Sequence, residues 1–396
     1  MYDPHTLRHM SLPPNLYMYI VPGAPKTTFM NNNSTVCRGH VNAAGAAVVD
    51  IHSAAFIGGI SNVGGALCVF GTANMSITDC VLSGAVAANG HGGCMAAEQD
   101  ATLRIMGTTL AGCDASQIGG CGGGIGARDQ ARVVVLNSTI SNTTAQVGGA
   151  VCVYQSSFVR LESTVISGCS CLGSGGAVLV QSVPPAQARF ELLSSTISRN
   201  AAGSNTQVTT DGEDGIAGGG VCVLGSASIL LGELELTENY AKFAGGGLYL
   251  HADSTTLFQG TKPTMVHNNT AGQVGGGIRV ASRLAEAAMS RFFRVDGNTA
   301  PKSPDVSVTA VLIQVVSSNG ESLVASDSRE GFLQVTLNVS GLNGMLSADP
   351  LRYVVYDSSR SLIFSQPVSS ERLQGEGTTL KEVVISLKQP PGGCGC

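Results

Sequence analysis

The chain has 396 residues, of which only 12% are charged, and a formal net charge of -5. No block of Lys or Arg stands out, so the sequence lacks the electrostatic footprint expected of a protein that binds nucleic acid or an anionic membrane. The 52 glycines follow no period of three, aromatic residues make up 5% and tryptophan is absent, a composition that favours tightly turned strands over a large mixed core.

Residues 1–40 show no hydrophobic periodicity and contain several prolines, which predicts a leader or an N-terminal cap. This segment has no basic start followed by a continuous apolar stretch, so no secretory signal is visible. The longest apolar run near an end of the chain, residues 306–316, is interrupted by polar residues and is too short to cross a bilayer. We therefore expect no transmembrane segment.

A Gly-Gly block recurs through the next part of the chain and predicts a solenoid over residues 41–310. Subtracting the starting positions of neighbouring copies gives steps of 28, 30, 26, 27, 43, 27 and 30 residues. The single long step predicts an insertion, residues 201–217, in a surface loop. The copies begin at Gly64, Gly92, Gly122, Gly148, Gly175, Gly218, Gly245 and Gly275.

Short runs that alternate apolar and polar residues follow each block, as in residues 158–161. A period of two over such short lengths is typical of strands, so each repeat is predicted to contain two or three of them. The third and fifth residues after the first glycine are apolar in every copy and are predicted to point inward. The residue between them varies from Cys68 to Tyr249 to Arg279 and is predicted to lie outside, so that Arg279→Ala would be nearly neutral.

Two further features of the repeat indicate parallel stacking in register. Asn200, Asn239, Asn269 and Asn298 each end the last run of their repeat, and asparagines stacked in this way can bond one another as a ladder. The paired glycines are expected to provide a positive φ and a close approach between layers.

The periodicity stops after Asn298, where residues 301–305 replace the Gly-Gly block. About six short strands separated by turn residues then predict a small antiparallel, sandwich-like region over residues 311–390. The alternative is that these strands cap the open end of the solenoid. The tail, residues 391–396, is predicted to be a truncated segment in which Cys394 and Cys396 could form an intermolecular disulfide.

Residues 142–151 and 269–278 resemble the Gly-Gly-Ala repeats of polymorphic outer-membrane proteins, although the Phe of that family's Phe-x-x-Asn motif is mostly replaced by Ile, Leu or Val. More broadly, residues 29–310 are similar to the right-handed parallel β-helix proteins of the pectin-lyase-like class. The resemblance implies a right-handed parallel β-helix over these residues. With about eight to ten coils counted from the repeats and the small antiparallel region predicted above after them, the whole chain is predicted to be all-β. That class includes surface adhesins and passenger domains as well as polysaccharide lyases and hydrolases.

Twelve cysteines and seven Asn-x-Ser/Thr sequons together favour an extracellular or cell-surface protein, with a glycoprotein as the corresponding expectation. Cys68, Cys152 and Cys222 share one column but lie several coils apart, so no bridge among them is expected, and most cysteines are predicted to be small packing residues. The sequons are at Asn32, Asn33, Asn74, Asn137, Asn142, Asn268 and Asn338.

Glycoside hydrolysis needs two carboxylates facing one bond, and the sequence offers one partial match. His91 between two glycines, with Asp79 upstream and Arg104 downstream, is similar to pieces of the polygalacturonase signature. The paired aspartates of that signature are missing and Met106 stands in place of its Lys. The preferred prediction is no catalytic site, with His91 as a histidine in a glycine-rich bend.

Asp211, Glu213 and Asp214, in the predicted insertion, could bind Ca²⁺ through oxygen ligands, but the EF-hand spacing is not met. The preferred prediction is no metal and no cofactor.

The predicted function is that of a non-catalytic extracellular or cell-surface repeat protein for adhesion, matrix assembly or recognition of a glycan or protein along its outer columns. The alternative is a polysaccharide lyase or glycoside hydrolase.

Overall fold

The computed structural model describes residues 27–33, 39–203, 216–251, 253–280 and 292–306 with their side chains. Outside these ranges it describes the backbone of several strands and of residues 307 and 308. Every element described is a β-strand. Among the described residues no helix is long and apolar enough to span a membrane.

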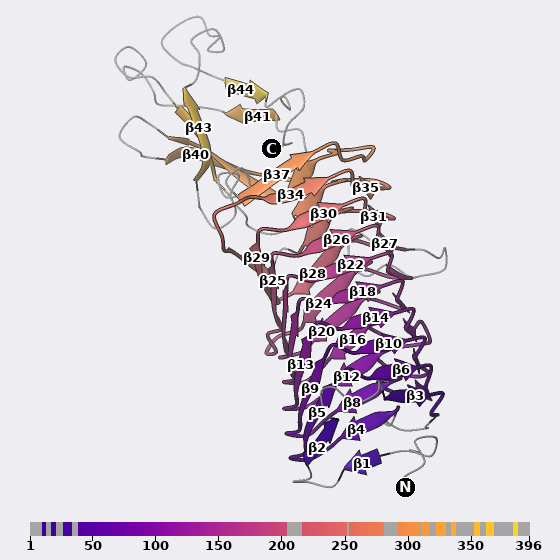
Figure 1. Cartoon of the computed structure of the whole chain (residues 1–396). Helices are drawn as coiled ribbons and strands as arrows, with labels where there is room; N and C mark the ends of the chain where they lie inside the picture. Colours follow the sequence, from indigo (N-terminus) through magenta and orange to yellow (C-terminus); the bar gives the residue numbers. More distant parts are fainter. Residues whose placement is uncertain are drawn as a thin grey trace, which may run out of the picture.

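The chain forms a parallel β-solenoid of about nine turns, which confirms the predicted fold (Figure 1). Within the rod a full turn contributes one strand to each of four sheets, which we name A to D in the order in which the chain visits them. The turns at the two ends lack a described strand in sheet B or sheet D. The predicted coil of two or three strands is therefore corrected to four. The fourth strand was missed because it is only two residues long, too short for an alternating pattern to show.

Sheets A and B lie on consecutive sides of the coil. In spatial order, sheet A consists of β1 (Met10–Leu12), β4 (Val41–Ala43), β8 (Leu67–Val69), β12 (Met95–Ala97), β16 (Ile125–Ala127), β20 (Val151–Tyr154), β24 (Val178–Ser182), β28 (Val221–Gly225), β32 (Leu248–Leu250), β36 (Ile278–Val280) and β38 (Val306–Val308). Sheet B consists of β2 (Tyr17–Ile20), β5 (Val48–His52), β9 (Asn74–Thr78), β13 (Thr102–Met106), β17 (Arg132–Leu136), β21 (Phe158–Glu162), β25 (Arg189–Leu193), β29 (Ser228–Gly232) and β33 (Thr255–Phe258).

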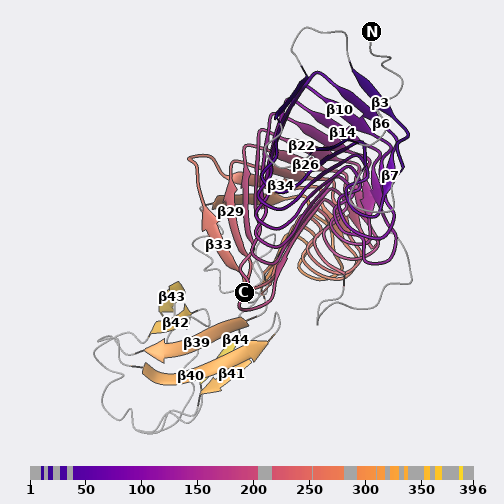
Figure 2. The same cartoon turned by 90° about the horizontal axis from the view of Figure 1, so that it is seen from below.

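Sheets C and D complete the coil, which is seen from the end in Figure 2. Sheet C consists of β3 (Thr28–Met30), β6 (Ala55–Ile57), β10 (Val81–Ser83), β14 (Thr109–Ala111), β18 (Thr139–Ser141), β22 (Val165–Ser167), β26 (Thr196–Ser198), β30 (Glu235–Thr237), β34 (Thr264–His267) and β37 (Phe293–Asp296). Sheet D consists of β7 (Ile60–Ser61), β11 (Val86–Ala87), β15 (Asp114–Ala115), β19 (Thr144–Ala145), β23 (Ser170–Cys171), β27 (Ala201–Ala202), β31 (Tyr240–Ala241) and β35 (Thr270–Ala271).

The inward columns are confirmed. In β20, Val151 and Val153 are fully buried and belong to the continuous hydrophobic core inside the coil. Their partners in the next coil, Val178 and Val180, stand directly beside them in a parallel register without a shift. Because each coil repeats this register, one apolar column continues from coil to coil.

The column of residues between the two inward columns was predicted to lie on the outside of the coil, and the outer face of sheet A corrects this prediction. Its members point away from the interior, yet Cys152, Leu179 and Tyr249 are buried in a second hydrophobic cluster. Ala217 and Ala244, from the segment that joins sheet D to sheet A, belong to the same cluster and form this cover. Arg279, in the same column, is only 7% exposed. The side chain of Arg279 is therefore not exposed, and the reason for expecting Arg279→Ala to be nearly neutral is wrong.

The two glycines of each block have different structural roles, a positive φ and a close approach between layers, and both roles were predicted. The first has a positive φ in all eight copies, between 60° and 76°, as at Gly148. The second does not, but a Cβ on Gly149 would overlap the carbonyl oxygen of Gly176 in the next coil. The block is therefore a corner at which adjacent layers touch through their backbones.

The predicted asparagine ladder is present at the corner between sheets C and D. The Nδ2 of Asn200 donates to Oδ1 of Asn239 at 2.9 Å, Asn239 donates to Asn269 at 2.9 Å, and Asn269 donates to Asn298 at 3.0 Å. The last amide donates to Oδ1 of Asp305 at 2.9 Å. Each Oδ1 also accepts the backbone N–H of the preceding rung, as Asn239 does for Asn200.

A second ladder, at the corner between sheets B and C, was not predicted. The backbone N–H of Thr108 donates to Oγ of Ser138 at 3.1 Å, and that of Thr164 donates to Oγ of Ser195 at 3.0 Å. Each hydroxyl in turn donates to the carbonyl two residues earlier, as Ser138 does to Leu136 at 2.7 Å. The signal was the recurrence of Ser or Thr before four successive strands of sheet C, β14, β18, β22 and β26, with the same period as the glycines.

The insertion is narrower than predicted. Ala201 and Ala202 form β27, and Ala217 pairs with Ala244 in a parallel bridge, so all three belong to the coil. The candidate Ca²⁺ ligands Asp211, Glu213 and Asp214 lie outside the described residues.

Near the C-terminus the described backbone pairs antiparallel. These strands are β39 (Ala310–Val316), β40 (Ser322–Arg329), β42 (Arg352–Tyr356), β43 (Leu362–Pro367), β41 (Gln334–Leu337) and β44 (Val383–Ser386). The first four form one sheet and the last two another. Sandwich-like packing in this region stays a prediction, and Cys394 and Cys396 lie outside the described residues.

Candidate functional site

His91 lies on the segment that joins sheet D to sheet A, at the position that Cys121, Ala217 and Ala244 occupy in other coils. Its side chain is only 2% exposed. A Cβ on Gly126 would lie 2.6 Å from Cδ2 of His91, so the imidazole takes the space that a side chain at residue 126 would fill. His91 is therefore part of the cover over sheet A.

Glu98 is the charged partner of His91. Its Oε1 lies 3.0 Å from Nε2 of the imidazole, which is ion-pair distance, although neither ring nitrogen has a hydrogen-bond partner of good geometry. The contact with His91 lowers the pKa of Glu98, burial opposes that change, and the charge of Arg128 adds to the lowering. This pair compensates for placing an imidazole in an apolar cover.

The structure places the other two catalytic candidates elsewhere. Asp79 is exposed at the corner between β9 and β10, with a φ of 53°, and Arg104 is exposed on the outer face of β13. The contacts of His91 described above are with Glu98 and Gly126. The three candidates thus lie on separate parts of the coil and are not brought together.

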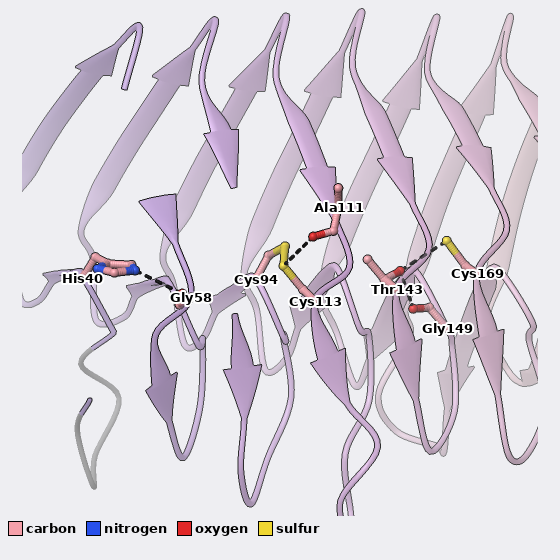
Figure 3. The surroundings of a disulfide bond; sticks show 8 residues. All are labelled: His40, Gly58, Cys94, Ala111, Cys113, Thr143, Gly149 and Cys169. Carbon is pink, nitrogen blue, oxygen red and sulfur yellow. Dashed lines mark hydrogen bonds between the residues drawn. A yellow bond between two sulfur atoms is a disulfide. The ribbon is translucent and has the colours of Figure 1, made fainter. Parts of the chain in front are cut away.

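Most cysteines were predicted to be small packing residues, and two described disulfides correct this prediction. Cys94 and Cys113 are bonded across the interior of one coil, with their Cα atoms 5.3 Å apart (Figure 3). Cys121 and Cys152 are bonded outside sheet A, with a Cα separation of 5.7 Å. Cys68 is also disulfide-bonded. The partner of Cys152 is thus a residue of the covering segment rather than another member of its column, which is why the column spacing did not predict the bond.

Other cysteines are buried thiols. The hydroxyl of Thr143 donates to Sγ of Cys169 at 3.2 Å and to the carbonyl oxygen of Gly149 at 2.7 Å (Figure 3). Burial raises the pKa of Cys169 and raises that of Cys171 to about 12. Thiols of this kind are poor nucleophiles and metal ligands. In the part of the chain that the structure describes, no group of three or more His, Cys, Asp or Glu side chains is arranged for a metal ion.

The outer face of sheet B carries an arginine on each of four successive strands, β13, β17, β21 and β25. We call this surface the sheet B face; its arginines are Arg104, Arg132, Arg160 and Arg189. The guanidinium of Arg132 lies 4.3 Å from the ring centroid of Phe158 in the next coil. Next to Arg104 is an open depression of about 180 Å³, whose lining residues include Asp50, Asn74, Ser76 and Thr102.

Two carboxylates on the sheet B face share one guanidinium. Arg160 contacts Glu162 at 2.6 Å and Glu191 at 3.5 Å. Paired carboxylates are what a glycosidase requires, but there they flank a sugar bond. Here the guanidinium of Arg160 is bound to both, so the group forms an ion-pair network. The depression described above lies over β5, β9 and β13, away from this pair.

Fold and surface together define the class: a parallel β-solenoid with one covered sheet, sheet A, and a charged, open sheet beside it. In comparisons with known proteins, no family model matches the chain, and no similar curated protein or solved structure was found. The likeness to polymorphic outer-membrane and pectin-lyase-like repeats therefore rests on the repeat residues alone.

Proposed function

We propose that the chain is a non-catalytic extracellular or cell-surface rod that recognises a glycan or protein ligand in adhesion or matrix assembly. The observation that carries the proposal is the contrast between two neighbouring sheets. The outer face of sheet A is buried under its own connecting segments, whereas the sheet B face exposes Arg104, Arg132 and Arg189.

The chemistry of the sheet B face suits recognition. A guanidinium offers several N–H donors in a fixed plane to carboxylate or hydroxyl oxygens. The ring of Phe158, half-buried beside Arg132, adds an apolar surface. Arginine and aromatic residues are enriched at protein interfaces for these reasons.

The extracellular part of the proposal is supported by the disulfides Cys94–Cys113 and Cys121–Cys152. Disulfides form and persist in oxidising compartments and are rare in reducing ones. Both bonds lie in neighbouring coils, where they join segments of the same rod.

The test is a binding assay with the full chain immobilised and polygalacturonate, heparin, dextran and fibronectin as probes. We expect at least one probe to bind, and the triple variant R104A/R132A/R189A to weaken that binding at least tenfold. The control is T109A/S141A on sheet C, which should bind like the parent. Equal binding by both variants, or binding of none of the probes, would count against the sheet B face.

The second candidate function is a polysaccharide lyase or hydrolase, and the Glu162–Arg160–Glu191 group is the observation that favours it. It predicts release of unsaturated or reducing sugars from polygalacturonate, with loss of that activity in E162Q and E191Q. Such activity in the parent protein, abolished in both variants, would overturn the non-catalytic proposal.

A further inference from the structure

The described asparagines of the rod include a buried set and a set of exposed sequon asparagines. Among the residues whose side chains are described, none of the buried asparagines is followed by Ser or Thr at the second position. These are Asn42, Asn200, Asn239, Asn269 and Asn298. By contrast, Asn33, Asn74, Asn137, Asn142 and Asn268 are exposed, and each of them begins a sequon.

Three of the exposed sequon asparagines lie at corners of the coil. Asn137 lies at the corner between sheets B and C, and Asn142 and Asn268 lie at the corner between sheets C and D. Their φ angles are 48°, 53° and 56°. This left-handed conformation, which asparagine tolerates better than most residues, turns the chain sharply at the vertex of the coil.

The residue after each of these asparagines is a buried corner residue: Ser138, Thr143 or Asn269. The alternation is clearest at the tandem pair Asn268 and Asn269. Asn269 is fully buried in the ladder, whereas Asn268 is exposed and holds only a 3.2 Å contact with its neighbour His267. Of these two adjacent asparagines, the exposed one begins a sequon and the buried one does not.

The hydroxyl residues that complete the three sequons are also on the outside. Thr139, Thr144 and Thr270 are half-buried on the outer faces of β18, β19 and β35. Asn74 differs, because it projects from a strand and lines the depression beside Arg104. The corner asparagines instead stand on convex edges, where a branched sugar chain meets no wall.

We propose that Asn137, Asn142 and Asn268 are N-glycosylation sites, an inference that rests on the extracellular part of the proposed function. In the transfer, Nδ2 of the asparagine attacks C1 of an oligosaccharide carried on a lipid diphosphate. The Nδ2–C1 bond forms and the C1–O bond to the diphosphate breaks. The lipid diphosphate departs with the bonding electrons, and the amide loses one proton to a base. A sugar chain at such a site is bulky and solubilising.

The positions have a consequence for the surface. Asn137 and Asn142 bracket β18, so their sugar chains would cover the outer face of sheet C at that coil. This region includes Val165 on the neighbouring strand, which is 42% exposed. Ligand recognition is thereby directed to other faces of the rod.

The experiment expresses the full chain in cultured animal cells with an added signal sequence that routes it into the secretory pathway. The secreted protein is treated with peptide N-glycosidase in ¹⁸O water, which converts each glycosylated asparagine to labelled aspartate. We expect label at Asn137, Asn142 and Asn268 and none at the buried asparagines. Secreted protein that lacks label at the three corners overturns the proposal.

Matched variants show which sequon carries each sugar chain. T139A, T144A and T270A each remove one sequon, and each should increase gel mobility by one glycan step. T109A, S170A and T299A lie in the same columns one coil away. The residues that they replace complete no sequon, so these variants should leave mobility unchanged. Equal mobility within each pair would overturn the assignment. The added signal makes this result independent of the chain's natural location, so the proposed function keeps its own separate test.

Discussion

At the scale of the residue, two buried histidines of the coil, His91 and His40, each lie beside a local polar group. His91 takes a position that Ala217 and Ala244 fill elsewhere, and Glu98 lies 3.0 Å from it. His40, also buried, has Nε2 3.1 Å from the carbonyl oxygen of Gly58, and its pKa is lowered chiefly by burial. Such contacts offset the cost of removing a polar group from water.

The contact between Glu98 and His91 predicts that the stability of the folded protein depends on pH in the acid range. Because the folded protein lowers the pKa of this carboxyl, the ionised form contributes stability above its unfolded pKa of about 4.3. That contribution disappears as the pH falls through the lower, folded value. We expect E98Q to unfold about 1 kcal/mol more easily at pH 7, and we expect this difference to be smaller at pH 3.

Urea titrations at both pH values measure this difference. D100N is the control, since Asp100 is exposed in the same turn and should change little at either pH. A deficit of E98Q that persists unchanged at pH 3 would contradict the role given to ionised Glu98.

At the scale of the element, the corners hold successive coils together. Sheets supply parallel backbone pairing, while the corners add side-chain ladders that satisfy the backbone N–H groups where the chain turns. The amides of Asn200, Asn239 and Asn269 are buried and donate or accept at each available atom, so a missing rung leaves its neighbours unsatisfied.

Asn239→Ala should therefore destabilise the rod by about 4 kcal/mol. The Oδ1 atom accepts from both nitrogens of Asn200, and Nδ2 donates to Ile197 and Asn269, with a net value of about 1 kcal/mol for each typical hydrogen bond. Thermal unfolding measures the loss. Glu235→Gln, on the exposed part of the same coil, is the control, and equal melting temperatures for the two variants would contradict the ladder.

Two glycines at different corners of the coil, Gly112 between sheets C and D and Gly149 in a Gly-Gly block, predict different costs of substitution. Gly112 has a φ of 60° and open space around its missing Cβ, so Gly112→Ala should cost only the left-handed strain of about 1–2 kcal/mol. A Cβ at Gly149 would overlap backbone atoms of the next coil, so Gly149→Ala should cost about 3 kcal/mol or more. Denaturant titration compares them, and a smaller loss for Gly149→Ala would contradict the close approach.

At the scale of the whole molecule, stability runs along the rod. Each coil pairs only with the coils before and after it, so the chain is close to one-dimensional and its segments can open separately. The disulfides Cys94–Cys113 and Cys121–Cys152 lie in successive coils and hold one part of the rod more firmly than the rest.

The double variant C94A/C113A should destabilise that part by about 3 kcal/mol, because it releases a loop with a sequence separation of 19 residues. Hydrogen exchange of the amides in β12 to β17 is the measurement, since a single melting temperature averages over a repeat array. C169A, which removes a buried cysteine outside any disulfide, is the control. Faster exchange confined to coils remote from β12 and β15 would contradict the prediction.

The sequence by itself determined the repeat, the inward columns, the paired glycines and the asparagine ladder. These features follow from one physical condition: parallel coils stacked in register place residue n of one coil against residue n of the next. At Val151, Gly149 and Asn239 the environment therefore repeats with the period of the chain. When every residue of a column is apolar, or glycine, or asparagine, that residue type indicates the environment that all members of the column share.

Only the tertiary structure decided which outer faces are open. The path of the segment that joins sheet D to sheet A cannot be read from a two-residue alternation. This segment packs in one hydrophobic cluster with Tyr249 and brings Cys121 to Cys152. It also turns His91 from a candidate catalyst into part of a cover. These contacts join different columns of different coils, and their distances depend on how the chain folds back, which no spacing along the sequence records.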